Sequence, residues 1–328
     1  MRKYVVLGCL LVFLLASCAS SGTKSVSDTS ASTPAGPRQG GMGVDKSYDT
    51  ELATMVKEVA PSFKQFTYND AETGRTMVYN LYIPEGYDGS SAYPLVLFMP
   101  DASLVGRGAS ATLAQGWGGL IWATEEEQAK HPCFVLVPTF TGPDAATNDD
   151  YQVSDEAEAT YRLLLSVLDT YKVDTDRVYT TGQSMGCMLS FYLNIAHPEM
   201  FAASIFVSGH WNPVSVGTLA DKHFFYISSA ADSKFAAKID AVKENLSNNG
   251  AKIVEDEWSA KLSLDEQNAL VEKMLAEGGN VNLIEFSPGS VVPEGMTETN
   301  PDFVEHMYAF DHAYMISAVR DWLFTQSK

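Results

Sequence analysis

The most specific chemical motif in this sequence is a serine between two glycines, Gly182-Gln183-Ser184-Met185-Gly186. A strand-like segment, 177–181, leads into the motif, and an apolar helical segment, 188–195, leads out of it. A G-x-S-x-G pattern in this context predicts a nucleophile elbow, a sharp turn that exposes a serine Oγ at the end of a strand. The two glycines fit, because neighbouring backbones pass close to such a turn. The alternative interpretation is a glycine-rich turn in which the serine caps the helix.

A serine hydroxyl needs a base that removes its proton before it becomes a good nucleophile. In sheets with this elbow, an acid and then a histidine follow the serine along the chain. Of the six histidines, only His306 and His312 come late enough to be that base. We expect His306, in a loop before the last helix, to be the base. His312, at the start of that helix, is the alternative candidate and could instead cap or pack.

The acid of such a triad should follow a strand that comes after the elbow. Asp232 fits, because it stands in the turn that leaves the strand-like segment 223–227. Asp221 precedes that strand, and Asp240 falls on the next predicted helix. A carboxylate held against the imidazole would fix its tautomer and stabilise the imidazolium. The alternative interpretation of Asp232 is an ordinary helix N-cap.

Two N–H donors must also face the charge that develops on the substrate oxygen. Met185, directly after the serine, is expected to supply one donor. The second is expected from the loop after the apolar segment 94–99, where Asp101, Ala102 and Ser103 are the candidates.

The elements that would position these residues alternate between strand and helix. Short continuous apolar runs suit strands buried on both faces of a parallel sheet. Strands are predicted at 63–68, 77–83, 94–99, 133–137, 177–181, 203–207, 223–227 and 282–286. Helices are predicted up to about residue 130 and at 154–171, 188–195 and 314–324. The pattern predicts an α/β three-layer sandwich, with a mostly parallel central sheet and an N-terminal antiparallel hairpin.

Composition and charge exclude several classes of protein and of binding partner. The 328 residues are 45% hydrophobic and 19% charged, which excludes a disordered or collagen-like chain. Acidic residues outnumber basic ones by 41 to 22, and this negative field would repel nucleic acid. The acidic stretch 144–158 does not match a calcium-binding loop, so no metal or cofactor is predicted. Cys133 and Cys187 are expected to be buried hydrophobes and not a disulfide.

The N-terminus resembles a bacterial lipoprotein signal. Arg2 and Lys3 precede an apolar run, 4–16, that is too short for a membrane helix. The run ends in Leu15-Ala16-Ser17-Cys18, which resembles a lipobox and implies cleavage before Cys18 and lipidation of its thiol. We therefore expect a signal peptide over 1–17, a lipidated Cys18 with a flexible tether over 18–48, and a hydrolase domain over 49–328. The protein would then be exported and anchored to a bacterial membrane.

With the elbow and the strand pattern established, the chain resembles the α/β-hydrolases. Within them it is similar to a secreted branch of predicted peptidases and esterases, near feruloyl esterases and polyhydroxybutyrate depolymerases. The segments 82–87, 93–98, 128–138 and 318–324 carry this resemblance. The chain departs from the family pattern at one place. After the strand at 94–99 the family usually has His-Gly, and this chain has Pro100-Asp101. Proline has no N–H to donate, and the Asp101 carboxylate must turn away from an oxyanion.

These features predict a serine hydrolase of carboxylic esters, with a small-molecule or polysaccharide-linked ester as substrate. The resemblance also allows a serine peptidase. A third hypothesis is a non-catalytic carbohydrate-binding lipoprotein, with an aromatic platform of Trp117, Trp122, Trp211 and Tyr151. Trp117, His210 and Trp211 are the candidate substrate-binding residues.

We predict that Cys18→Ser prevents lipidation, because the Cys18 thiol is the group that a lipobox acylates. Labelling with a radioactive fatty acid in a bacterial host measures this directly. The unsubstituted protein should take up label and the variant should not. An unlabelled parent protein would contradict the lipobox interpretation.

Overall fold

The structure is a computed structural model that describes residues 46–142, 146–295 and 300–328. The predicted signal peptide, Cys18 and most of the predicted tether lie outside the described residues. Within the described part of the chain, no helix combines the length and the apolar character that crossing a membrane requires.

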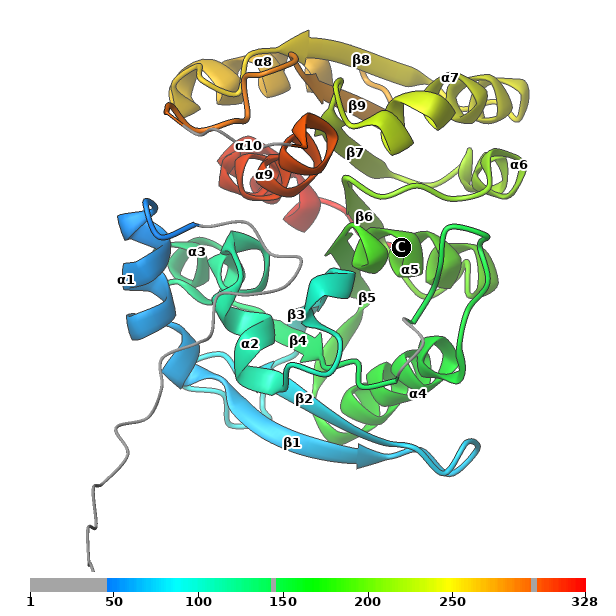
Figure 1. The fold of residues 1–328 in the computed structure, drawn as a ribbon. Helices are drawn as coiled ribbons and strands as arrows, with labels where there is room; N and C mark the ends of the chain where they lie inside the picture. Colours follow the sequence, from blue (N-terminus) through cyan, green and yellow to red (C-terminus); the bar gives the residue numbers. More distant parts are fainter. Residues whose placement is uncertain (1–45, 143–145, 296–299) are drawn as a thin grey trace, which may run out of the picture. The chain divides into compact units, whose positions relative to one another are not determined.

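A nine-stranded sheet forms the centre of the described region, in the order β1-β2-β4-β3-β5-β6-β7-β9-β8 (Figure 1). The first two strands form an antiparallel hairpin, β2 pairs antiparallel with β4, and all other pairs are parallel. The strands are β1 Lys64–Asn69, β2 Thr76–Tyr82, β3 Tyr93–Met99, β4 Phe134–Pro138, β5 Val173–Gln183, β6 Ala203–Val207, β7 Phe224–Ser229, β8 Ile253–Trp258 and β9 Val281–Phe286. The predicted fold class, including the N-terminal hairpin, is confirmed.

Helices cover both faces of this sheet. The α-helices are α1 Thr50–Glu58, α2 Ala109–Ala114, α3 Glu125–Lys130, α4 Asp155–Thr170, α5 Met185–Ala196, α6 Pro213–Val216, α7 Ser233–Asn248, α8 Leu264–Ala276, α9 Pro301–Met315 and α10 Ser317–Phe324. Successive strand residues point to opposite faces. In β3, Leu95 and Leu97 therefore pack with α4 and α5, while Val96 and Phe98 pack with α9 and α10. This arrangement makes the three layers visible in Figure 1.

The two cysteines of the described region lie on opposite faces of the sheet. Cys133 belongs to the core beneath α9 and α10, and Cys187 to the core beneath α5 and α7. Both are free and buried, which confirms the expectation of buried hydrophobes. Burial raises the pKa of both thiols, because the thiolate would lose its solvation.

Strand β8 and helix α8 were not among the elements predicted from the sequence. The segment Ile253–Trp258 carries three acidic residues and forms the edge of the sheet, and only Val254 and Trp258 in it are buried. It therefore lacks the continuous apolar run by which the central strands were recognised. The extra crossover through β8 and α8 precedes β9, which inserts between β7 and β8.

A buried carboxylate ties the hairpin to α4. Asp70, at the end of β1, is 2% exposed and accepts two hydrogen bonds from Arg162, Nε to Oδ1 at 2.6 Å and Nη2 to Oδ2 at 2.8 Å. Thr73 N–H also donates to Oδ2. The Arg162 guanidinium holds the pKa of the Asp70 carboxyl well below its usual range. The bond thus stabilises the fold above the unfolded pKa of about 3.9, and this stability is lost as pH falls below that value.

We predict that Asp70→Asn lowers the free energy of unfolding by about 1.5–3 kcal/mol at pH 7, because a charged hydrogen bond is lost. The difference from the parent protein should shrink as pH falls below about 4, because the Asp70 carboxyl of the unfolded chain then binds a proton while the native carboxylate, with its lowered pKa, stays ionised. Urea unfolding at pH 7 and pH 3 measures both effects. If Asp70→Asn lowers the free energy of unfolding equally at pH 7 and pH 3, the ionised Asp70–Arg162 pair is not the cause of the lost stability.

Candidate active site

Backbone crowding creates the turn that presents Ser184. This residue has φ 53° and ψ −118°, a left-handed conformation that costs a non-glycine residue about 1–3 kcal/mol. A Cβ on Gly182 would lie 2.9 Å from Met99 O, and one on Gly186 would overlap that same carbonyl and lie 2.8 Å from Pro100 O. Only glycine lets β3, β5 and α5 approach this closely. Because α5 begins at Met185, Ser184 stands between the end of β5 and the start of the helix.

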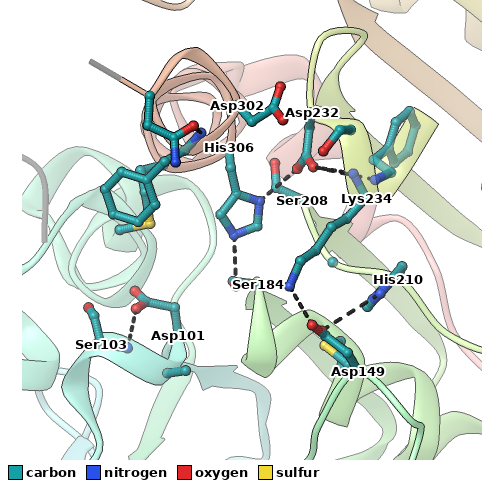
Figure 2. Close-up of a pocket in the computed structure, with 18 residues that line it drawn as sticks. Asp101, Ser103, Asp149, Ser184, Ser208, His210, Asp232, Lys234, Asp302 and His306 are labelled. Atoms are coloured by element: carbon teal, nitrogen blue, oxygen red, sulfur yellow. Dashed lines mark hydrogen bonds and ion pairs between the residues drawn. The ribbon is translucent and has the colours of Figure 1, made fainter. Parts of the chain in front are cut away.

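The structure brings Ser184, His306 and Asp232 into one hydrogen-bonded chain (Figure 2). His306 Nε2 lies 2.8 Å from Ser184 Oγ, and His306 Nδ1 lies 2.6 Å from Asp232 Oδ2. With Nδ1 protonated toward the carboxylate, Nε2 is free to accept the serine proton. The imidazole is largely buried, and Phe310 packs edge-on against it with ring centroids 5.1 Å apart. The three residues follow the carboxyl ends of three different strands. Ser184 comes after β5, Asp232 after β7, and His306 after β9.

Asp232 fits both interpretations of its position in the sequence. Its Oδ1 accepts hydrogen bonds from Lys234 N and Phe235 N and so caps α7. Its Oδ2 faces His306, and the whole residue is only 2% exposed. The helix cap orients the carboxylate so that one oxygen remains for the histidine.

The placement of His306 in a loop is wrong, since His306 lies within α9. Asn300 caps this helix by accepting from Phe303 N–H, and Pro301 stands in its first turn. Asparagine followed by proline is a helix-start signal that the sequence analysis overlooked. His312 was expected at a helix start and instead lies in the last turn of α9, where its Nε2 is 3.3 Å from Val291 O. Burial lowers the pKa of His312.

The far end of α9 is held by a buried ion pair. Asp311 Oδ2 lies 2.6 Å from Lys46 Nζ, and both side chains are more than 90% buried. Asp311 Oδ1 also accepts a hydrogen bond of 2.9 Å from Trp117 N–H. Lys46 and Tyr48, which the sequence analysis placed in the tether, thus lie against α9, with the Tyr48 and Tyr308 rings 6.0 Å apart.

The predicted oxyanion-hole residues lie at the start of α5 and in the loop after β3. Met185 is the first residue of α5, and the first N–H groups of a helix have no partner within it. Ala102 begins a short 3-10 helix, Ala102–Leu104, and lines the same pocket as Ser184. Ser103 N–H donates to Asp101 Oδ1 at 2.7 Å, so this candidate donor is already engaged. The Asp101 carboxylate is 2% exposed and also accepts from Gln183 Nε2, which satisfies it within the protein.

A pocket of about 400 Å³ opens above Ser184. Asp101, Ala102, His210, Asp232 and His306 are predicted site residues that line it. The other lining side chains are mainly apolar or small, with a few charges: Ser103, Asp149, Met188, Ser208, Ser233, Lys234, Phe235, Asn300, Asp302, Phe303 and Met307. The pocket can hold a small acyl or alkyl group next to the serine.

One wall of the pocket carries an ion pair that the sequence analysis missed. Lys234 Nζ lies 2.5 Å from Asp149 Oδ2, and His210 Nε2 lies 3.8 Å from Asp149 Oδ1 (Figure 2). The Lys234 hydrogen bond lowers the pKa of Asp149. Burial lowers the pKa of His210, and the Asp149 charge opposes that effect. Lys234 lies in the first turn of α7, two residues after Asp232, and its partner Asp149 is 85 positions away in the sequence.

The predicted aromatic residues do not line this pocket. Trp211 is 5% exposed and packs in the core against Tyr151, while Trp122 is fully buried. Trp117 uses its indole N–H to bind Asp49 Oδ2 at 2.8 Å. Trp117 and Trp211 therefore lie outside the lining of the Ser184 pocket, and Trp122 and Trp211 are too buried to belong to a surface platform. Large aromatic rings such as Trp122 and Trp211 stabilise the fold more when they are buried in the core than when they are exposed at the surface.

Among the residues that the structure describes, one group has the spacing of metal ligands. Glu127, His131 and Asp321 offer atoms within 4.8 Å of one another. His131 Nε2 lies 2.8 Å from Asp321 Oδ1, and Arg320 Nε donates to Glu127 Oε2 at 3.0 Å. These groups already pair with one another, and none of them lines the Ser184 pocket.

Comparisons with known proteins give the family and the fold of the chain. A family model described as "Putative esterase" matches residues 71–270. Among solved structures, the chain is similar to a thermostable esterase, with 24% identity and a TM-score of 0.62 over 82% of this chain. It is also similar to a ferulic acid esterase, with 11% identity and a TM-score of 0.51 over 80% of this chain and 96% of that one. A search of curated proteins gave no match.

The two solved structures establish the fold, since their identities are below 25%. The chain spans 64% of the length of the thermostable esterase. The family match covers more than half of the 328 residues and includes β5, the elbow and the Asp232 turn. The protein therefore belongs to this esterase family and has the α/β-hydrolase fold.

Proposed function

We propose that this protein is a serine hydrolase that cleaves carboxylic esters with Ser184, His306 and Asp232. The observation that carries the proposal is the unbroken hydrogen-bond chain from Ser184 Oγ through both imidazole nitrogens to Asp232 Oδ2. The strained backbone at Ser184 and the pocket above it support the same assignment.

In the first half of the reaction, Ser184 Oγ attacks the ester carbonyl carbon while His306 Nε2 takes the serine proton. The tetrahedral intermediate carries its negative charge on the former carbonyl oxygen. Met185 N–H and the N–H of Ala102 or Asp101 are the proposed donors to that oxygen. Asp232 Oδ2 keeps the Nδ1 proton and stabilises the imidazolium.

Collapse of the intermediate breaks the bond to the leaving alcohol. The imidazolium returns its proton to the alkoxide oxygen, and the acyl group stays on Ser184. Water then attacks the acyl-enzyme while His306 again acts as the base. The second collapse releases the carboxylic acid and restores the Ser184 hydroxyl.

The choice of an ester over an amide rests on leaving-group chemistry and on the family. An alkoxide leaves more readily than an amine, and the family model is one of esterases. Hydrolysis of p-nitrophenyl, feruloyl, acetyl-xylan and peptide substrates tests the choice. Turnover of peptides without turnover of esters would replace this proposal by a serine peptidase.

We also propose that the hydrolase acts at a bacterial membrane surface, held by lipid on Cys18. The lipobox-like ending of the apolar run, 4–16, supports this proposal. The substrate would then be an ester that reaches the exported side of that membrane.

We predict that Ser184→Ala lowers kcat for ester hydrolysis by about 10⁴-fold or more, because the nucleophile is removed. Reaction with a fluorophosphonate probe should be lost as well. Matching thermal unfolding curves would show that the fold is intact. Near-parental turnover by the purified variant would exclude the proposed mechanism, and an unlabelled, inactive parent protein would favour a non-catalytic role.

A second prediction separates the two histidines. His306→Ala should cost about as much as Ser184→Ala, because nucleophile and base act as a unit. His312→Ala should retain kcat within about threefold, since its Nε2 is near the backbone at Val291 and not near Ser184. Steady-state kinetics of both variants measure this. An inactive His312→Ala beside an active His306→Ala would reverse the assignment.

A further inference from the structure

The base of the proposed triad lies within a helix, so its position depends on how α9 is held. His306 is preceded by Glu305, a charged residue that is only 6% exposed. The triad does not use Glu305, and consecutive helix residues point about 100° apart. Its carboxylate therefore has another partner inside the protein.

Glu305 bonds two segments on either side of the site. Its Oε2 accepts a hydrogen bond of 2.6 Å from Ser229 Oγ, and its Oε1 accepts one of 2.6 Å from Gly289 N–H. Ser229 is the last residue of β7, and Gly289 lies in the loop after β9. One buried carboxylate thus joins α9 to the ends of two neighbouring parallel strands.

The Ser229 contact leads directly to the acid of the triad. Ser229 Oγ also accepts from Ala231 N–H at 3.1 Å, so its single hydrogen is the one given to Glu305. Asp232 N–H donates to Ser229 O at 3.0 Å and closes the turn that carries the Asp232 side chain. Glu305 therefore binds the first residue of the turn whose last residue contacts His306.

We infer that Glu305 is a positioning residue that sets the distance between His306 and Asp232. The inference rests on the proposed hydrolase function. Burying a carboxylate is costly unless good hydrogen bonds compensate it, and both bonds here are short. Removing it would leave Ser229 Oγ and Gly289 N–H without their acceptor and let α9 shift. A displacement of about 1 Å at such a site can cost about 100-fold in rate.

The test compares Glu305→Ala with Glu305→Gln. We expect Glu305→Ala to lower kcat by about 30–100-fold, with KM changed less than about threefold, because positioning and not substrate contact is lost. Glu305→Gln keeps an acceptor for Gly289 N–H and should lose only about 3–10-fold. The acid limb of the kcat/KM profile should move to lower pH in Glu305→Ala, because a looser Asp232 bond stabilises the imidazolium less.

Three further variants give controls: Ser229→Ala, its double variant with Glu305→Ala, and Asp70→Asn. Ser229→Ala should lower kcat less than Glu305→Ala, and the double variant should be no slower than Glu305→Ala, because the two residues act through one bond. Asp70→Asn is the matched control, since it also alters a buried carboxylate but lies at the end of the hairpin, away from the pocket. It should lower thermal stability and leave kcat per fluorophosphonate-titrated site unchanged. The inference would be overturned if Glu305→Ala, like Asp70→Asn, lowered thermal stability and left kcat per titrated site unchanged.

A spectroscopic readout works even without turnover. The His306 Nδ1 proton, in a bond of 2.6 Å to Asp232, should give a far-downfield proton NMR signal that disappears in His306→Ala. We expect this signal to move upfield in Glu305→Ala and to change less in Glu305→Gln. An unchanged signal in Glu305→Ala contradicts the positioning role. A parent protein that shows the signal but neither turns over substrate nor reacts with fluorophosphonate contradicts the hydrolase proposal instead.

Discussion

The close approach of three backbone segments at the end of β5 is the constraint on which the site depends. Gly182 and Gly186 allow the backbone of β3 to pass within contact distance, and the chain can then turn sharply at Ser184. The strain at that residue is held by the parallel strands on either side and by α5. With that turn in place, the serine hydroxyl, the first N–H groups of α5 and the pocket all lie on the same edge of the sheet.

Parallel strands explain how residues far apart in the sequence reach that edge. The parallel strands β5, β6, β7 and β9 are consecutive in the sheet, so the segments that follow β5, β7 and β9 all begin at the same edge. Each supporting side chain then serves two segments at once. Asp232 caps α7 and faces His306, and Glu305 joins α9 to the ends of β7 and β9. The site is thus built from the same hydrogen bonds that stabilise its framework.

Most of this arrangement follows from short-range signals. The apolar runs of the central strands and the serine between glycines are local patterns, and they gave the fold and the elbow. β8 was missed because an edge strand with three acidic residues has no such run. His306 was chosen over His312 for a position in a loop that does not exist, and it reaches Ser184 from within a helix. The Asp149–Lys234 pair joins residues 85 positions apart, and no local pattern announces such a contact.

The buried pair of Lys46 and Asp311 has a practical consequence for shortened versions of the protein. A fragment that begins at residue 49, the start expected for the domain from sequence, would lack the ammonium group that compensates Asp311. An uncompensated buried carboxylate is strongly destabilising, and this one lies on the helix that carries His306. For recombinant production, the minimal folding unit should therefore begin upstream of Lys46.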